Sequence, residues 1–138
     1  MADKRPVFRM LVFTKDAPEA IGPYSQAIVA NGFVFISGQI GIDPSTSKLT
    51  KGIENQTRQA LENMKAILQE AHSSLENVVK VTVFIKNMDD FKKVNDIYRS
   101  YFSSEPPARS CVEVNKFPLE NALVEIEAIA VVPEGASK

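Results

Sequence analysis

Short β-rich runs open the chain. Val7–Phe13, Gln26–Ala30 and Phe33–Ile40 are rich in branched and aromatic residues, which favours strands. Asn31 and Gly32 separate the second run from the third. An Asn-Gly pair between two such runs predicts a hairpin, because both turn positions need a positive φ. The segment between the first two runs contains prolines and a glycine, so we expect a loop there.

A helical period follows. From Ile53 the apolar residues recur every three or four positions, which predicts a helix with one face on a core that ends near His72. The residues that set this period are Ala60, Leu61, Met64, Ile67, Leu68 and Ala71. Val78–Ile85 is dense in β-branched residues and predicts a central strand with little solvent contact.

A second helix is expected after Asn87, whose side chain is suited to cap it. Its predicted buried face carries Phe91, Val94, Tyr98, Tyr101 and Phe102. Pro106 and Pro107 are expected to end it.

Two further strands are predicted at Arg109–Val114 and Leu123–Val132, joined by a loop. The order of elements, β-β-β-α-β-α-β-β, indicates an α+β fold with two helices on one face of a mixed sheet. Such a sheet has a second face without cover. We expect that face to be buried in an oligomer if the strands are apolar on both sides.

The composition narrows the class of protein. With 138 residues, 44% of them hydrophobic, residues 1–138 are expected to form one domain. The net charge of -1 argues against electrostatic binding to nucleic acid or to an anionic membrane.

Cys111 is the only cysteine, which excludes an intrachain disulfide and favours a reducing compartment. The sequence shows no membrane span or secretory signal, so a cytoplasmic location is expected. Import into mitochondria is compatible with the sequence, although Asp3 matches a transit peptide poorly.

Candidate chemistry concentrates in the last two strands. Side chains alternate along a strand, so Arg109, Cys111 and Glu113 share one face. Glu125 and Glu127 likewise share a face, about 7 Å apart along their strand. If the two strands are neighbours, they present an arginine, a thiol and two carboxylates together.

Each of these groups has a structural and a functional interpretation. Arg109 could form a surface or interface salt bridge, or it could bind a substrate carboxylate with its planar, two-pronged donor. Cys111 has no histidine near it in sequence to act as a base, which favours a packed side chain over a nucleophile. Glu125 and Glu127 could be solvated, or a half-buried one could orient water or transfer protons. One histidine and one cysteine argue against a zinc site.

Two short glycine-containing segments have the same two interpretations. Residues 22–25 (GPYS) and 37–39 (SGQ) fit turns and strand ends. Alternatively, Tyr24 and Ser37 supply hydroxyls and Gly38 lets a ligand approach the backbone. Neither segment has the glycine spacing of a phosphate-binding loop.

Four segments together resemble the RidA (YjgF-type) family: residues 21–26 (IGPYSQ), 35–40 (FISGQI), 107–114 (PARSCVEV) and 125–131 (EIEAIAV). Residues 81–85 (VTVFI) and the second helix match the family in order and spacing, so the resemblance covers nearly the whole chain. It implies a chorismate-mutase-like two-layer fold with a mixed six-stranded sheet. It also implies a homotrimer around a central β-barrel, with sites in the clefts between subunits.

The activity that the resemblance implies is 2-iminobutanoate/2-iminopropanoate deamination. Such enzymes hydrolyse enamine and imine products of pyridoxal-phosphate enzymes, such as 2-aminoacrylate and 2-aminocrotonate, to 2-keto acids and ammonia, which limits metabolite damage. No metal or organic cofactor is implied.

Residue by residue, Arg109 matches the arginine that binds the substrate carboxylate, and Glu125 matches the acid that acts on water. Tyr24 is expected to orient the substrate. The remaining matches to pocket positions are Ser37, Gly38, Asn95 and Cys111. Two alternatives stay open: a non-catalytic module that binds small carboxylates or acts as a chaperone, and an RNA-directed translation inhibitor.

Overall fold

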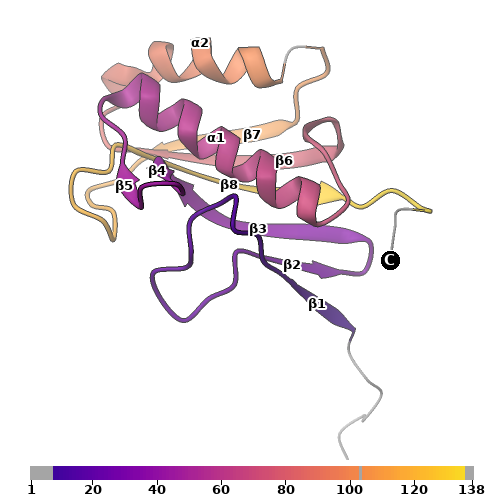
Figure 1. Ribbon diagram of the computed structural model, residues 1–138. Coiled ribbons are helices and arrows are strands. Elements are labelled where there is room, and N and C mark those ends of the chain that lie inside the picture. The colour runs from indigo at the N-terminus through magenta and orange to yellow at the C-terminus, as the bar shows by residue number, and fades with distance from the viewer. Residues whose placement is uncertain (1–7, 103, 136–138) are drawn as a thin grey trace, which may run out of the picture.

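A six-stranded sheet carries two helices on one of its faces (Figure 1). The computed structural model describes residues 8–102 and 104–135. The sheet strands are β1 (Arg9–Val12), β2 (Ala27–Ala30), β3 (Phe33–Ile40), β6 (Val78–Ile85), β7 (Ala108–Glu113) and β8 (Val124–Val131). The helices are α1 (Ile53–Glu70) and α2 (Phe91–Tyr101). This is the α+β arrangement of two helices and a mixed sheet that the sequence predicts.

The spatial order of the strands is β1-β2-β3-β8-β6-β7. All neighbours are antiparallel except β6 and β7, which run parallel. The predicted hairpin between β2 and β3 is confirmed, since Asn31 has φ 54° and Gly32 has φ 82°. Because β8 crosses back between β3 and β6, the C-terminal strand lies in the middle of the sheet and β7 lies at its edge.

The predicted element bounds differ from the structure in a few places. Val7, the expected start of the first strand, lies outside the described residues. The structure also contains a second, two-stranded sheet of β4 (Ile42–Asp43) and β5 (Lys48–Leu49) and a short 3-10 helix η1 (Leu75–Asn77), which the sequence pattern does not predict. Asn87 caps the 3-10 turn η2 (Met88–Asp90) rather than α2 itself, because its side chain accepts from the backbone N–H of Asp89.

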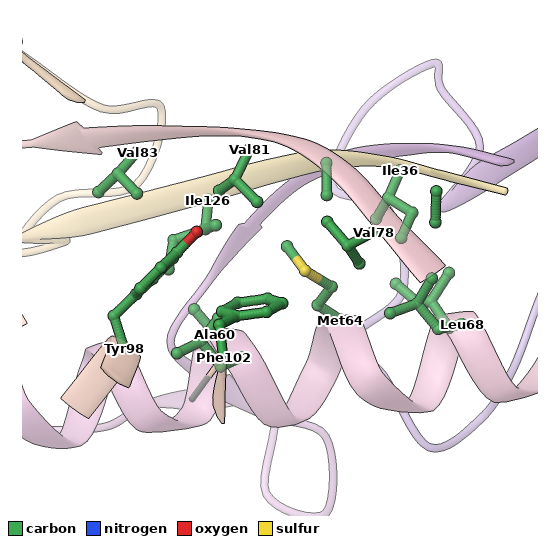
Figure 2. Packing of buried hydrophobic residues seen from close by; sticks show 14 of the residues in the cluster. Ile36, Ala60, Met64, Leu68, Val78, Val81, Val83, Tyr98, Phe102 and Ile126 are labelled. Atoms are coloured by element: carbon green, nitrogen blue, oxygen red, sulfur yellow. The ribbon is translucent and has the colours of Figure 1, made fainter. Parts of the chain in front are cut away.

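The core lies between the helices and the sheet (Figure 2). Met64 and Leu68 of α1 face Val81 and Ile126 of the sheet, and all four are fully buried. This is the helix face that the sequence period predicts. Val78–Ile85 was predicted to have little solvent contact, and the structure shows alternation instead, with the residues that point away from the helices partly open.

The other face of the sheet lacks cover in the single chain. Phe33 is 37% exposed and Phe35 is 45% exposed on β3, and Leu11 and Val112 extend the apolar surface onto β1 and β7. The predicted apolar second face is therefore confirmed. Its burial against other copies of the chain stays a prediction.

Candidate active site

A cavity of about 540 Å³ opens at the end of β3 that leads into β4. It is lined by residues 18–24 of the loop before β2, by the last residues of β3 and by two glutamates of β8. Four of the predicted site residues meet here: Tyr24, Ser37, Gly38 and Glu125. These four residues, which the resemblance to the RidA family implies for the pocket, therefore lie together in the structure.

The loop that forms one wall of the cavity is held by a buried glutamine. The Gln26 side-chain amide donates to the backbone carbonyls of Thr14, Ala17 and Pro18, and its oxygen accepts from the backbone N–H of Thr14. Gln26 is 3% exposed. Sequence reasoning did not single it out, although a polar residue at the head of an apolar strand is the signal that could have found it.

Tyr24 and Ser37 are fixed by hydrogen bonds within the cavity wall. The Tyr24 hydroxyl accepts from the backbone N–H of Ile21 at 3.2 Å, which turns the ring back along its own loop. The Ser37 hydroxyl donates to the carbonyl of Ser25 at 2.6 Å. Both hydroxyls keep further hydrogen-bonding capacity for a ligand.

Glu125 lies against Gly38, where the pairing of β3 with β8 shifts register. A Cβ at position 38 would lie 2.6 Å from the Glu125 Cδ, so only glycine leaves room for this carboxyl group. Burial raises the pKa of the Glu125 carboxyl, and the nearby charge of Glu127 raises it further. A partly buried carboxyl with a raised pKa is suited both to accept and to return a proton during a reaction.

The other predicted residues form a separate cluster between α2 and β7. Arg109 and Cys111 share one face of β7, as predicted, and the Arg109 guanidinium lies over aromatic rings of α2. The Asn95 Oδ1 atom is buried and has no hydrogen-bond partner among the described residues. Burial raises the pKa of the Cys111 thiol, although the Arg109 charge opposes the shift, so this thiol is a poor nucleophile.

The expectation that β7 and β8 lie side by side and present all four groups together is wrong. β6 lies between them, so the two strands are about 10 Å apart. Arg109 pairs with Val81, which points toward the helices, whereas Glu125 pairs with Phe84, which points the other way. Within one chain, the arginine and the glutamate therefore lie on opposite faces of the sheet.

The residues that the structure describes contain neither a metal-binding group of side chains nor a membrane-spanning helix. No group of three or more His, Cys, Asp or Glu side chains there could hold a metal ion. None of the helices in residues 8–102 and 104–135 is long and apolar enough to cross a membrane.

Comparison with known proteins identifies the family. The family model described as Endoribonuclease L-PSP matches residues 14–132. The chain belongs to this family, which is also the YjgF/RidA family. The match contains both residue groups described above, so the resemblance found in the sequence is confirmed.

Members of the L-PSP family with similar sequences come from distant organisms. A RutC family protein of Pyrococcus horikoshii is 56% identical over 87% of this chain and 95% of its own length. A human protein named 2-iminobutanoate/2-iminopropanoate deaminase is 44% identical over 91% of each chain. The solved structure of E. coli TdcF with bound serine has a TM-score of 0.85 and 41% identity, and covers 88% of this chain and 98% of the other.

Proposed function

We propose that this protein hydrolyses small 2-imino acids, such as 2-iminopropanoate and 2-iminobutanoate, to 2-keto acids and ammonia. The observation that carries the proposal is the Glu125 carboxyl, partly buried in a cavity and with a raised pKa. The name of the 44% identical human relative supports the choice of substrate. The serine in E. coli TdcF supports a ligand of this size, because serine is a small 2-amino acid.

On this proposal, Arg109 binds the substrate carboxylate. A guanidinium matches a carboxylate with two parallel N–H donors, which fixes the plane of the ligand as well as its position. Asn95 and the backbone beside Cys111 lie in the same cluster and complete the binding surface. The thiol itself forms no bond to the substrate.

Glu125 transfers the protons of the reaction. The ionised carboxylate accepts a proton from water as the water oxygen adds to the carbon of the protonated imine, which gives a carbinolamine. The same carboxyl group then returns the proton to nitrogen. As the C–N bond breaks and ammonia leaves, the regenerated carboxylate takes the hydroxyl proton of the carbinolamine, which leaves the keto acid, and this proton then passes to ammonia or solvent. Proton transfer of this kind contributes about 10²–10⁴-fold, and Tyr24 and Ser37 orient the substrate beside it.

A site that uses both Arg109 and Glu125 requires more than one copy of the chain. We propose a homotrimer in which the apolar face with Phe33 and Phe35 is buried around a central barrel. Arg109 lies on the edge strand β7, so a second copy can bring its own cavity against this edge. Each site then consists of the α2–β7 cluster of one copy and the cavity of another.

The family description also names ribonuclease activity. The net charge of -1 argues against broad electrostatic binding to a phosphate backbone, and the only histidine of the sequence, His72, is an exposed residue just after α1. These observations favour the imine substrate over RNA.

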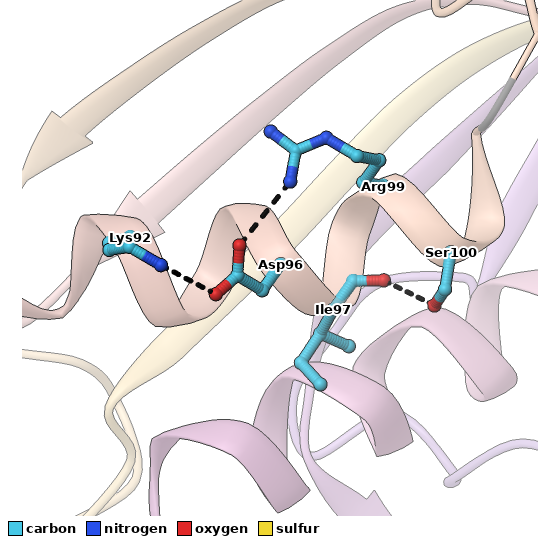
Figure 3. A network of polar contacts seen from close by, with 5 residues as sticks. All are labelled: Lys92, Asp96, Ile97, Arg99 and Ser100. Atoms are coloured by element: carbon cyan, nitrogen blue, oxygen red, sulfur yellow. Dashed lines mark hydrogen bonds and ion pairs between the residues drawn. The ribbon is translucent and has the colours of Figure 1, made fainter.

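The test is keto-acid release from 2-aminoacrylate that a serine dehydratase generates in situ. Wild type should accelerate release, and Arg109→Ala and Glu125→Gln should not. Arg99→Ala is the matched control, because this arginine pairs with Asp96 on the solvent side of α2 (Figure 3). Light scattering should show three copies per particle. No acceleration by wild type over spontaneous hydrolysis would overturn the proposal, and a monomer with full activity would overturn the shared site.

A further inference from the structure

We propose that Phe91 and Tyr98 form an aromatic bracket that positions the Arg109 guanidinium for a ligand carboxylate. Both are positioning residues that act through Arg109. The inference rests on the proposed role of Arg109, and it gives a function to two residues for which the sequence predicts only a place on the buried face of a helix.

The geometry of the bracket is set by α2. Phe91 and Tyr98 are seven residues apart, which is about two helical turns and places both on one face of the helix. The Arg109 Cζ atom lies 5.5 Å from the centroid of the Phe91 ring and 4.7 Å from that of Tyr98. Both distances lie within the range of about 6 Å at which a cation is attracted to an aromatic face.

The bracket holds the guanidinium without using its hydrogen-bond donors. Among the described residues, no carboxylate forms an ion pair with Arg109, and no acceptor takes a hydrogen bond from it. Aromatic contacts engage the flat face of a guanidinium, whereas its five N–H groups point outward in the plane. The rings therefore restrict the side chain while leaving the N–H groups to a carboxylate.

The nearby carboxylates are engaged elsewhere. Asp96 of α2 accepts from Lys92 and Arg99 on the outer side of the helix (Figure 3). Glu113, which shares the Arg109 face of β7, accepts from the backbone N–H of Met88 at 2.8 Å. Neither competes with a ligand for Arg109.

The ring of Tyr98, rather than its hydroxyl, is the part that acts. The hydroxyl is buried without a hydrogen-bond partner among the described residues. The ring, in contrast, contacts both the guanidinium and Phe102, whose centroid is 4.7 Å away. Tyr98 is 7% exposed, so shortening it would also disturb the core, whereas Phe91 is 37% exposed and can be changed with less effect on folding.

The experiment measures pyruvate binding by titration calorimetry and, separately, KM and kcat for 2-aminoacrylate. We expect Phe91→Leu to weaken binding about 3- to 10-fold, the range of a partly buried cation–π contact. The loss should be in KM rather than kcat, since the carboxylate contact is made before and during the reaction. Phe91→Tyr and Tyr98→Phe keep the rings and should bind within about 2-fold of wild type.

Comparison with Arg109→Ala separates the bracket from the carboxylate role of Arg109. If Arg109→Ala abolishes binding and Phe91→Leu leaves it unchanged, the bracket is wrong and the carboxylate role of Arg109 stands. If Arg109→Ala leaves pyruvate binding unchanged, or wild type binds none, both the carboxylate role and the bracket are wrong.

Discussion

A methyl group added at Gly38 tests whether Glu125 must keep its present position for catalysis. In Gly38→Ala the new Cβ would lie 2.6 Å from the Glu125 Cδ and 2.8 Å from its Cγ and Oε2. Nonbonded carbon atoms approach to about 3.5–4.0 Å, so the carboxyl group must move by about 1 Å. Gly38 is not among the glycines with positive φ, so the substitution acts through this contact and not through backbone strain.

Gly38→Ala should lower the catalytic activity more than the stability of the fold. Displacement of a reacting group by about 1 Å lowers turnover by about 10²-fold. Overpacking costs about 1–3 kcal/mol in a closed core, and the open cavity beside Glu125 should keep the cost near the lower end. The assay is kcat for keto-acid release, with the free energy of unfolding measured in urea. Arg99→Ala is the control for turnover, because this arginine pairs with Asp96 on the solvent side of α2 and does not line the cavity.

A double variant decides whether the contact is the cause. In a Glu125→Ala background, Gly38→Ala should cost no stability, because the side chain that it displaces is gone. Wild-type turnover in Gly38→Ala would refute the reasoning. So would an equal loss of stability with and without the Glu125 side chain.

Three further predictions concern the ionisable groups. Glu127→Gln removes a negative charge that raises the pKa of Glu125, so the Glu125 pKa should fall. The limb of the kcat/KM pH profile that reports the ionisation of Glu125 should therefore move to lower pH. If this limb does not move, it belongs to another group. Arg109→Lys should lose nearly as much activity as Arg109→Ala, since an ammonium lacks the two-pronged donor, and near-normal turnover would contradict this. Cys111→Ala should keep most of the activity, because the raised pKa leaves the thiol protonated; a folded but inactive variant would show that the sulfur is required.

The sequence predicts the long elements of the fold best. The bounds of β3 and β6 agree with the prediction to the residue, and α1 begins at Ile53 as expected. Dense runs of β-branched and aromatic residues mark the two strands, and a helical period of apolar residues marks α1. Two-residue strands such as β4 and β5 carry no period, so the pattern could not reveal them. The cap at Asn87 was recognised, but a capping side chain alone does not distinguish a 3-10 turn from an α-helix.

The candidate site shows where prediction from one sequence stops. The predicted alternation of side chains is confirmed within each strand. Arg109 and Cys111 share one face of β7, and the consecutive residues Glu125 and Ile126 point to opposite faces of β8. Which strands are neighbours depends on contacts between residues far apart in the chain, and no local pattern encodes that β6 separates β7 from β8. The resemblance gave the residue types but not the fact that they form two clusters.

The register of β7 determines how those clusters can cooperate. The observed pairing of Arg109 with Val81 assigns the arginine to the helix side of the sheet. A shift of one residue would turn it to the side of Glu125, because successive side chains of a strand point to opposite faces. The guanidinium lies over the Phe91 and Tyr98 rings on that side, so on the proposed mechanism the two groups that act on one substrate come from different chains. On the proposed mechanism, this register makes assembly of the chains a condition of catalysis.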